Sequence, residues 1–380
     1  MALLPLLGHA EVRASLARAA LSGVLPQSVL LHGPAGIGKE RLGLWLAQLL
    51  LCESAQGDEP CGRCLPCRLV ERLEHPDLHW FFPLPRPDAS SPEKLREKLE
   101  ELRAAELAAR RADPFHLPQY ERAPAHFLAA VQTLQQIAAT RPSMGARKVF
   151  VVGDAEAMVP QESSPEAANA FLKLLEEPPD HTTLILTAQH PGTLLPTILS
   201  RVLPVRVRPL PREELAMFLA EARGVSRDEA TRIAALAQGA LGRALRLLPA
   251  GGEPGAQEKH RHEGRRLLEA ALSDTATARL AAAHALPAFG ARGDFLDLLD
   301  AFAGWLRDLL AVAAGVPDQV VNSDGTEMLT GAARKRRVAP LAVAAALERL
   351  PAARELAFGN VNPQLILAEL LYGVSADLAA

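Results

Sequence analysis

The chain has 380 residues, a formal net charge of -3 and four cysteines. This length exceeds one usual domain and indicates two or three, and the charge excludes a global basic field that would draw the whole protein to DNA or to a membrane surface. No apolar run is long enough to span a bilayer, and the first residues lack the basic region of a signal peptide. We therefore expect a cytoplasmic protein.

A glycine-rich loop is the first strong motif in chain order. Residues 29–31 predict a short strand before the loop, and residues 42–51 predict a helix after it. Between them the pattern G-x-x-x-x-G-K is complete, and the residues expected to bind phosphate are Gly33, Gly36, Gly38 and Lys39. Glycines let backbone N–H groups turn toward an anion, while the lysine and the helix N-terminus add positive charge. We therefore predict a phosphate cradle.

The residue after Lys39 departs from the pattern of a working ATPase. That position normally carries Ser or Thr, whose hydroxyl holds a magnesium ion, but here it is Glu40. A carboxylate cannot copy the hydroxyl geometry and adds negative charge beside phosphates. The cradle is therefore a candidate site for ATP, ADP or phosphate bound without hydrolysis.

The four cysteines form the second strong motif. They are Cys52, Cys61, Cys64 and Cys67, spaced C-x8-C-x2-C-x2-C. In a reducing compartment this spacing favours a tetrahedral structural Zn²⁺ site over disulfides. Four unconnected buried cysteines remain an alternative, and a redox pair is less favoured because no thioredoxin-like frame surrounds the motif. We predict a zinc module at residues 52–67, inserted after the helix of the cradle.

A strongly apolar strand at residues 148–153 ends in Asp154, where P-loop ATPases place a carboxylate that helps to hold magnesium. The adjacent acid that would activate water is replaced by Ala155. The next acid is Glu156, and we expect its side chain to point away because successive side chains of an extended segment alternate. A second part of the hydrolytic machinery is therefore missing.

The remaining pattern predicts an α/β domain followed by helices. Strands are also expected at residues 78–83, 182–187 and 203–207, and helices at residues 10–21 and 125–140. Residues 93–111 predict a charged helix of mixed sign with a sparse apolar stripe at Leu95, Leu99, Leu102 and Leu107. We interpret this helix as a solvated insertion without chemistry. Beyond Arg208 the pattern is helical, with a linker near residues 249–254.

Several motifs, in this order, resemble the bacterial clamp-loader AAA+ family. They are the glycine-rich loop, the cysteine module, Glu176-Glu177-Pro178-Pro179 and Ser200-Arg201. Further similar stretches are His75-Pro76-Asp77, Trp305-Leu306-Arg307-Asp308-Leu309-Leu310, and Asn360-Val361-Asn362-Pro363 with Glu369. The resemblance covers nearly the whole chain and is weakest at residues 93–111. It implies an α/β P-loop AAA+ domain at residues 1–208 with the zinc module inserted, a small helical lid at 209–250 and an all-α collar domain for oligomerisation at 251–380.

The resemblance also implies a function and partners. Members of this family form a hetero-oligomeric ring, with delta and tau/gamma subunits, that loads the sliding clamp at primer–template DNA during replication; no membrane is involved. Arg201, with Ser200, matches the arginine finger that reaches the ATP of a neighbouring subunit, although Val202 stands where the family usually has cysteine. The Walker B aspartate, sensor 1 and sensor 2 match Asp154, Thr187 and Arg243.

Two functions stay open within the family. One is a non-hydrolysing subunit that stiffens the ring and donates an arginine finger; the other is an active ATPase of the tau/gamma type. The second needs Ser or Thr after Lys39 and Glu after Asp154, and the chain has neither. We therefore expect little or no intrinsic ATPase from this subunit of a DNA-directed DNA polymerase (nucleotidyltransferase) holoenzyme. A zinc-dependent DNA reader is less favoured, because only Arg63, Arg68 and Arg72 add basic charge near the cysteines.

Overall fold

The computed structural model describes residues 3, 6–118, 120, 122, 124–158, 166–249, 252–287, 292–358 and 361–379. Two compact units account for the chain. The first comprises Met1–Tyr120, Pro124–Ala230 and Gln238–Arg243, and the second Glu121–Ala123, Thr231–Ala237 and Ala244–Ala380. Within the described residues, none of the helices combines the length and the apolar character needed to cross a membrane. The three-part division into AAA+ domain, lid and collar stays a prediction.

The first unit is built on a five-stranded sheet with the order β2-β3-β4-β1-β5. The strands are β1 (Ser28–His32), β2 (Leu78–Phe81), β3 (Lys148–Val152), β4 (Thr182–Ala188) and β5 (Leu203–Arg206). All four pairings are parallel, which confirms the predicted α/β class. The near-continuous apolar runs of β1, β3 and β4 follow from this arrangement, because central parallel strands are covered on both faces.

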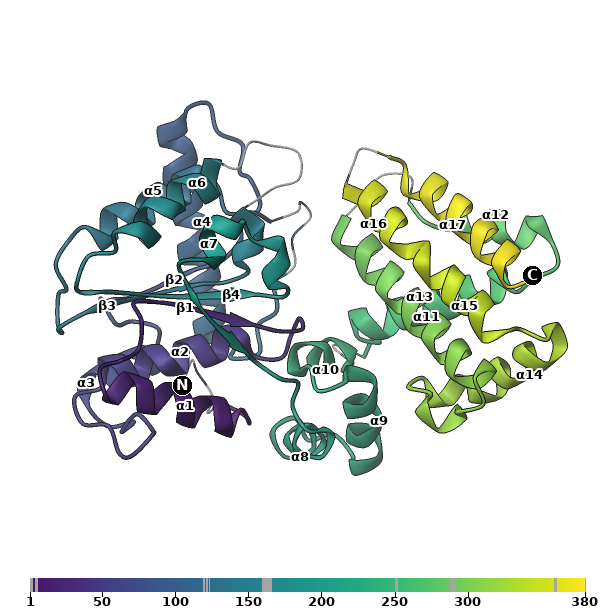
Figure 1. The fold of residues 1–380 in the computed structure, drawn as a ribbon, viewed down its shortest axis with the longest axis horizontal. Helices are drawn as coiled ribbons and strands as arrows, with labels where there is room; N and C mark the ends of the chain where they lie inside the picture. Colours follow the sequence, from purple (N-terminus) through teal and green to yellow (C-terminus); the bar gives the residue numbers. More distant parts are fainter. Residues whose placement is uncertain are drawn as a thin grey trace. The chain divides into compact units, whose positions relative to one another are not determined.

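Helices cover both faces of this sheet. They are α1 (Ala10–Leu21), α2 (Lys39–Leu51), α3 (Leu65–Glu71), α4 (Pro92–Ala112), α5 (Leu128–Ala138), α6 (Glu166–Glu176) and α7 (Pro196–Leu199). The 3-10 turns η1 (Ala155–Met158) and η2 (Pro191–Thr193) follow β3 and β4, and helix α8 (Arg212–Arg223) follows β5. Alternate residues of the central strands join different apolar clusters: Val149 and Val151 pack with α1, α2 and α3, whereas Phe150 and Val152 pack with α5, α6 and α7. Figure 1 shows these two helix layers on opposite sides of the sheet.

Helix α4 corrects one expectation. Its Leu99 is 2% exposed and belongs to the apolar cluster on the α2 side of the sheet. The guanidinium of Arg103 lies 4.7 Å from the ring centre of Phe81, and that of Arg110 lies 4.2 Å from the ring centre of Trp80. Long arginine side chains bury their stems and stack on aromatic faces, so a sequence that is rich in charge still packs. The interpretation of this helix as a solvated insertion is therefore wrong.

Asp77 explains the His75-Pro76-Asp77 stretch. Its carboxylate is fully buried and accepts backbone N–H groups from Ser143 (2.6 Å), Met144 (2.7 Å) and Gly145 (3.3 Å). The Asp77 N–H donates to Nδ1 of His75 at 3.0 Å. These bonds fix the turn that leads into β3. The motif therefore has a structural role at the amino ends of the strands, whereas the cradle lies at their carboxyl ends.

Asp77→Asn is expected to lower the free energy of unfolding by about 1–3 kcal/mol at neutral pH, because one acceptor oxygen becomes a donor facing buried N–H groups. Burial alone would raise the pKa of Asp77, but the hydrogen bonds from Ser143, Met144 and Gly145 outweigh it and lower the pKa. A lowered pKa in the folded state contributes stability above about pH 4, and this contribution is lost as the pH falls through the folded value.

Chemical denaturation at pH 7 and near pH 3 measures this effect. The difference between wild type and Asp77→Asn should shrink at the lower pH. Asp180→Asn, at an exposed aspartate, is the matched control and should change neither value. An equal loss for Asp77→Asn at both pH values would show that the charge of Asp77 is not involved.

The second unit is all-α in its described residues. Its helices are α11 (Ala256–Ala271), α12 (Ala276–His284), α13 (Arg292–Ala313), α14 (Thr326–Arg336), α15 (Pro340–Glu348), α16 (Leu350–Phe358) and α17 (Pro363–Asp377), with the turns η3 (Pro317–Gln319) and η4 (Ser323–Gly325). Helices α9 (Arg227–Ala237) and α10 (Leu241–Leu247) contribute residues to both units. The all-α C-terminal region confirms that part of the predicted fold class.

Two residues of α13 organise this second unit. Trp305 is fully buried, and its indole N–H donates to the Arg261 carbonyl at 2.8 Å. Asp308 accepts the backbone N–H groups of Val321 (3.0 Å) and Asn322 (2.8 Å), which ties the break between α13 and α14 to the core. The Trp305–Leu310 stretch is therefore structural. In the last resembling stretch Asn360 lies outside the described residues, and Asn362 caps α17.

Candidate functional site

The glycine-rich loop joins the carboxyl end of β1 to the N-terminus of α2. Gly33 must be glycine, because a Cβ there would lie 2.3 Å from the carbonyl oxygen of Val207. Gly36 has a left-handed φ of 72° and lies against the start of α10, whose Gly242 N–H donates to the Gly36 carbonyl at 2.8 Å. A Cβ at Gly36 would lie 3.2 Å from the backbone nitrogen of Arg243. The loop thus brings the predicted sensor-2 position to the cradle.

Lys39 points back into its own loop. Its side chain is buried, and Nζ donates to the Pro34 carbonyl at 2.9 Å. Burial lowers the pKa of Lys39, while the charges of Asp154, Glu156 and Glu40 oppose this change. The ammonium group is therefore held by a loop carbonyl and lies in the field of three carboxylates.

Glu40 is fixed by two elements that do not belong to the loop. The indole N–H of Trp80, on β2, donates to Oε2 of Glu40 at 2.7 Å, and NH1 of Arg110, on α4, lies 3.7 Å from the same oxygen. Burial and then the charge of Asp154 raise the pKa of Glu40, while Arg110 lowers it. Gly153 lies directly against the carboxylate, because a Cβ there would come within 2.6 Å of Oε2. The position of the magnesium-binding hydroxyl is held by this side chain.

The carboxyl ends of β3 and β4 meet beside the loop. The Asp154 N–H donates to Oγ1 of Thr187 at 2.9 Å, and Asp154 has a left-handed φ of 42°. The expectation that Glu156 points away is wrong, because the segment after Asp154 forms the turn η1 and is not extended. Oε1 of Glu156 accepts the Gln189 N–H at 2.8 Å, and burial raises the pKa of Glu156.

The structure thus gathers seven predicted residues at the carboxyl ends of the strands, where parallel sheets commonly bind ligands. They are Gly33, Gly36, Gly38, Lys39, Asp154, Thr187 and Arg243. It adds three residues that sequence reasoning missed. Trp80 and Arg110 hold Glu40, and His9 Nε2 lies 2.9 Å from the Ile37 carbonyl, to which its N–H donates. No spacing in the sequence indicated these contacts.

Arg201 and Ser200 lie apart from this group, at the end of α7. NH1 of Arg201 donates to the Thr197 carbonyl at 2.8 Å and lies 3.1 Å from Oγ of Ser200. NH2 of Arg201 is 2.8 Å from Oε1 of Glu176, with the Arg201 side chain 34% exposed. Among the described residues, the polar contacts of Arg201 are to α6, to α7 and to the adjacent Ser200, and none of them is to a residue of the cradle.

The four cysteines converge on one point. Their sulfur atoms all lie within 4.8 Å of one another, and the Cys61–Cys67 and Cys64–Cys52 pairs are each 4.0 Å apart. Four ligands at the usual Zn–S distance of about 2.3 Å stand about 3.8 Å apart, so the donor set fits a tetrahedral metal ion. Hydrogen bonds from Ser54 and from the backbone lower the pKa of Cys61 to about 5, which favours its thiolate, whereas burial raises the pKa of Cys52 and Cys67, so a metal ion would have to displace the protons of these two thiols.

The cysteine module is tied to the helices around it. The indole N–H of Trp45, on α2, donates to Glu59 at 2.8 Å, and Arg13, on α1, forms an ion pair with Glu59 at 3.3 Å. The Gln48 amide donates to the Cys67 carbonyl at 3.3 Å. Folding of the module is thereby coupled to α2.

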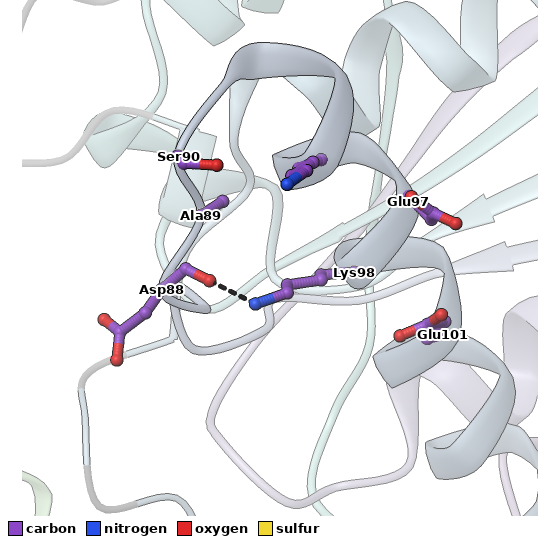
Figure 2. Close-up of a pocket in the computed structure, with 7 residues that line it drawn as sticks. Asp88, Ala89, Ser90, Glu97, Lys98 and Glu101 are labelled. Atoms are coloured by element: carbon purple, nitrogen blue, oxygen red, sulfur yellow. Dashed lines mark hydrogen bonds between the residues drawn. The ribbon is translucent and has the colours of Figure 1, made fainter.

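A shallow hollow at the start of α4 carries none of the predicted residues. It is lined by Asp88, Ala89, Ser90, Lys94, Glu97, Lys98 and Glu101. Figure 2 shows Lys98 donating to the Asp88 carbonyl, at 2.5 Å, with Glu97 and Glu101 on the same helix, α4. Charges of both signs line an open surface there, so the hollow selects no class of ligand.

Comparison with protein families gives matches over most of the chain. The family model described as DNA polymerase III, delta subunit, matches residues 8–211. A second model, described as DNA polymerase III, delta subunit, C terminal, matches residues 259–375.

Individual relatives match about half of the chain. DNA polymerase III subunit delta' of Pseudomonas aeruginosa is 35% identical over 172 residues, 45% of this chain and 40% of the relative. Subunit delta' of Escherichia coli is 27% identical over 220 residues, 58% of this chain and 54% of the relative. Subunit tau of Escherichia coli is 29% identical over 208 residues, 55% of this chain and 26% of the relative. The chain therefore spans about half or less of the length of these relatives.

Among solved structures, a DNA polymerase III gamma subunit-related protein from Thermotoga maritima is 16% identical. It has a TM-score of 0.42, with 97% of this chain and 99% of that chain covered. This likeness is too low to support a functional argument.

Proposed function

Because the chain belongs to the DNA polymerase III delta subunit family and is of the delta prime type, we propose that it is a non-hydrolysing subunit of the clamp loader that donates an arginine finger to a neighbouring ATPase. Membership confirms the resemblance based on the glycine-rich loop, the cysteine module and Ser200-Arg201. We interpret the His75-Pro76-Asp77 and Trp305–Leu310 stretches as resembling delta prime rather than other clamp-loader subunits.

The main observation in support of a subunit that does not hydrolyse ATP is the carboxylate of Glu40. A working P-loop holds its magnesium ion through a Ser or Thr hydroxyl at this position. Here Trp80 and Arg110 hold a carboxylate in that place, 2.7 Å and 3.7 Å from Oε2, so the side chain cannot swing away without breaking both contacts. Magnesium would lack its hydroxyl ligand, and the γ-phosphate would lack the charge neutralisation that the ion supplies.

The second support is the absence of a competent general base. Ala155 has no acidic group, and Glu156 is the next carboxylate along the chain. Its Oε1 already accepts the Gln189 N–H at 2.8 Å. The acid also stands one position later than the water-activating acid of a working P-loop ATPase.

The arginine finger is supported by the position of Arg201. The side chain is one-third exposed and is oriented by Thr197, Ser200 and Glu176 at the end of α7. It is not directed to the cradle of its own chain, so a guanidinium that acts on phosphate would act in trans. Its partners would be the delta and tau/gamma subunits of a hetero-oligomeric ring, and through that ring the sliding clamp and primer–template DNA.

An active ATPase of the tau/gamma type remains the second candidate, because the tau relative matches more than half of this chain. Steady-state ATP turnover by the purified chain separates the two functions. We expect negligible turnover and, at most, weak binding of ATP, ADP or phosphate by Lys39 and the loop glycines. Lys39→Ala, which removes the ammonium group, should lower any binding. Turnover that this substitution abolishes would establish the tau/gamma type and refute the proposal.

A further inference from the structure

Many basic side chains in the second unit form an ion pair with a nearby Asp or Glu. Helix α11 shows this pattern clearly, because its exposed cations each have an acidic partner nearby. The pairs are Lys259 with Glu253 (3.5 Å), Arg265 with Glu269 (2.8 Å) and Arg266 with Glu263 (3.0 Å). Arg349 likewise pairs with Asp377 at 2.5 Å. This pairing leaves little local positive charge along most of these helices.

The end of α14 departs from that pattern. Arg334, Lys335 and Arg337 are exposed, and none of them has a hydrogen-bonding or acidic partner for its side chain among the described residues. Arg336, between them, pairs with Asp274. We call Arg334, Lys335 and Arg337 the basic turn. It concentrates three unneutralised charges within four consecutive positions of a chain whose net charge is -3.

The backbone of the basic turn is rigid. The Val338 N–H donates to the Ala333 carbonyl (3.1 Å) and the Arg337 N–H to the Arg334 carbonyl (3.3 Å), which is the Schellman arrangement of a helix C-terminus. Val338 is 8% exposed and anchors the turn in the core. Arg337 has a φ of 53°, in the left-handed region where glycine is strongly preferred. An arginine there reduces local stability, which indicates that its side chain serves another purpose.

Helix capping alone does not account for this arrangement. The dipole of α14 favours a cation in its last turn, and Arg336 already provides one that is paired. Three further unpaired cations repel one another, and the dipole does not favour arginine over glycine in the left-handed position. The repulsion is relieved when a polyanion binds, and the contacts made to that polyanion offset the backbone cost.

We propose that the basic turn binds the phosphate backbone of DNA directly. Arginine guanidinium groups offer planar, bidentate donors to phosphate oxygens, and lysine adds a mobile point charge. Each phosphate contact releases condensed counterions, so such binding does not depend on base sequence and weakens as salt rises. This proposal goes beyond the proposed function, in which DNA is reached only through the ring.

An acidic protein surface is the competing partner. Such an interface centres on apolar or aromatic side chains, and the one that lies close along the chain is Leu341, which is 84% exposed. The basic turn itself presents only charge, since Val338 is buried beneath it. Phosphate contacts therefore fit its chemistry better, and Leu341 separates the two possibilities in the test.

The test measures the affinity of the reconstituted ring, and of the full chain alone, for fluorescein-labelled primer–template DNA by anisotropy, between about 50 and 200 mM salt. The variant replaces the three residues together (Arg334→Gln, Lys335→Gln, Arg337→Gln). We expect affinity at low salt to fall on the order of tenfold, and the slope of log K against log salt to decrease by about 0.9 for each phosphate that the variant no longer neutralises. The matched control replaces Lys259, Arg265 and Arg266 with Gln, which removes the same charge from α11.

Arg337→Gly separates a loss of DNA binding from a loss of folding. Glycine is favoured at this φ, so the unfolding midpoint should stay equal or rise while DNA affinity falls. Leu341→Ser should leave DNA binding unchanged. The proposal is overturned if the triple variant binds DNA like wild type or like the α11 control, or if Arg337→Gly keeps full DNA affinity. It is also overturned if only Leu341→Ser has an effect and that effect is weaker ring assembly, which would identify a protein partner.

Discussion

Arg201→Ala is expected to lower the DNA-stimulated ATPase of the reconstituted clamp loader by about 10³-fold, while the subunit still folds and joins the ring. A guanidinium at a neighbour's γ-phosphate stabilises the charge that develops in the transition state, and loss of such a finger costs on the order of 10³-fold or more in rate. In the single chain Arg201 pairs with Glu176, with both side chains partly exposed. An exposed ion pair of this kind contributes about 1 kcal/mol or less to stability. Breaking the Arg201–Glu176 pair so that Arg201 can contact a phosphate therefore costs little compared with the decrease in activation free energy.

Two substitutions sharpen this experiment. Arg201→Lys should restore little activity, because a point charge does not reproduce the planar fork. Arg208→Ala removes another exposed arginine of the same unit and should leave the rate unchanged. ATP hydrolysis, clamp loading and ring assembly by gel filtration are measured for each variant. Normal loading by Arg201→Ala, or a defect confined to assembly, would remove Arg201 from the reaction.

Cys64→Ser is expected to abolish metal binding and to lower the thermal unfolding midpoint sharply. We propose that the four cysteines hold one structural Zn²⁺ with no open position, and such sites supply about 10 kcal/mol or more of folding free energy in small zinc peptides. The contacts from Trp45, Arg13 and Gln48 to the module transmit the loss to α1 and α2. Phosphate binding should change little, because the module adjoins the end of α2 that is farther from the cradle.

Metal analysis of protein purified under reducing conditions without chelator should give close to one zinc per chain. Leu65→Ala is the matched control, since Leu65 follows Cys64 directly, is 50% exposed and offers no ligand atom. It should retain the metal and the unfolding midpoint. Protein that contains no zinc and is as stable as wild type in the presence of a chelator would refute the structural metal site.

The local parts of the fold were predictable from the sequence. The five strands, the glycine-rich loop and the all-α C-terminal region follow from apolar runs, glycine spacing and the loss of strand patterns after Arg208. The convergence of the cysteines was also predictable, because short C-x2-C steps bring ligands together whatever the rest of the chain does. In each case the determining interactions lie within a few residues of one another.

Contacts between distant segments were not predictable. The sequence of α4 indicated a solvated helix because its charges outnumber its apolar residues. Arg103 nevertheless stacks on Phe81, and Arg110 stacks on Trp80 and Phe82, so one face of α4 is buried. Glu156 was misplaced because the left-handed Asp154 turns the chain into η1, and one residue's φ is not visible in an apolar–polar pattern.

The sequence by itself determined that the cradle has lost the magnesium hydroxyl and the adjacent acid, because the identities of Glu40 and Ala155 are sufficient for that conclusion. Only the tertiary structure decided what replaces them. Trp80 and Arg110 come from different segments and meet at Glu40 because the sheet order places β2 next to β3, and α4 packs over the rings of Trp80 and Phe82. Such a meeting depends on how layers stack, and no residue spacing encodes it.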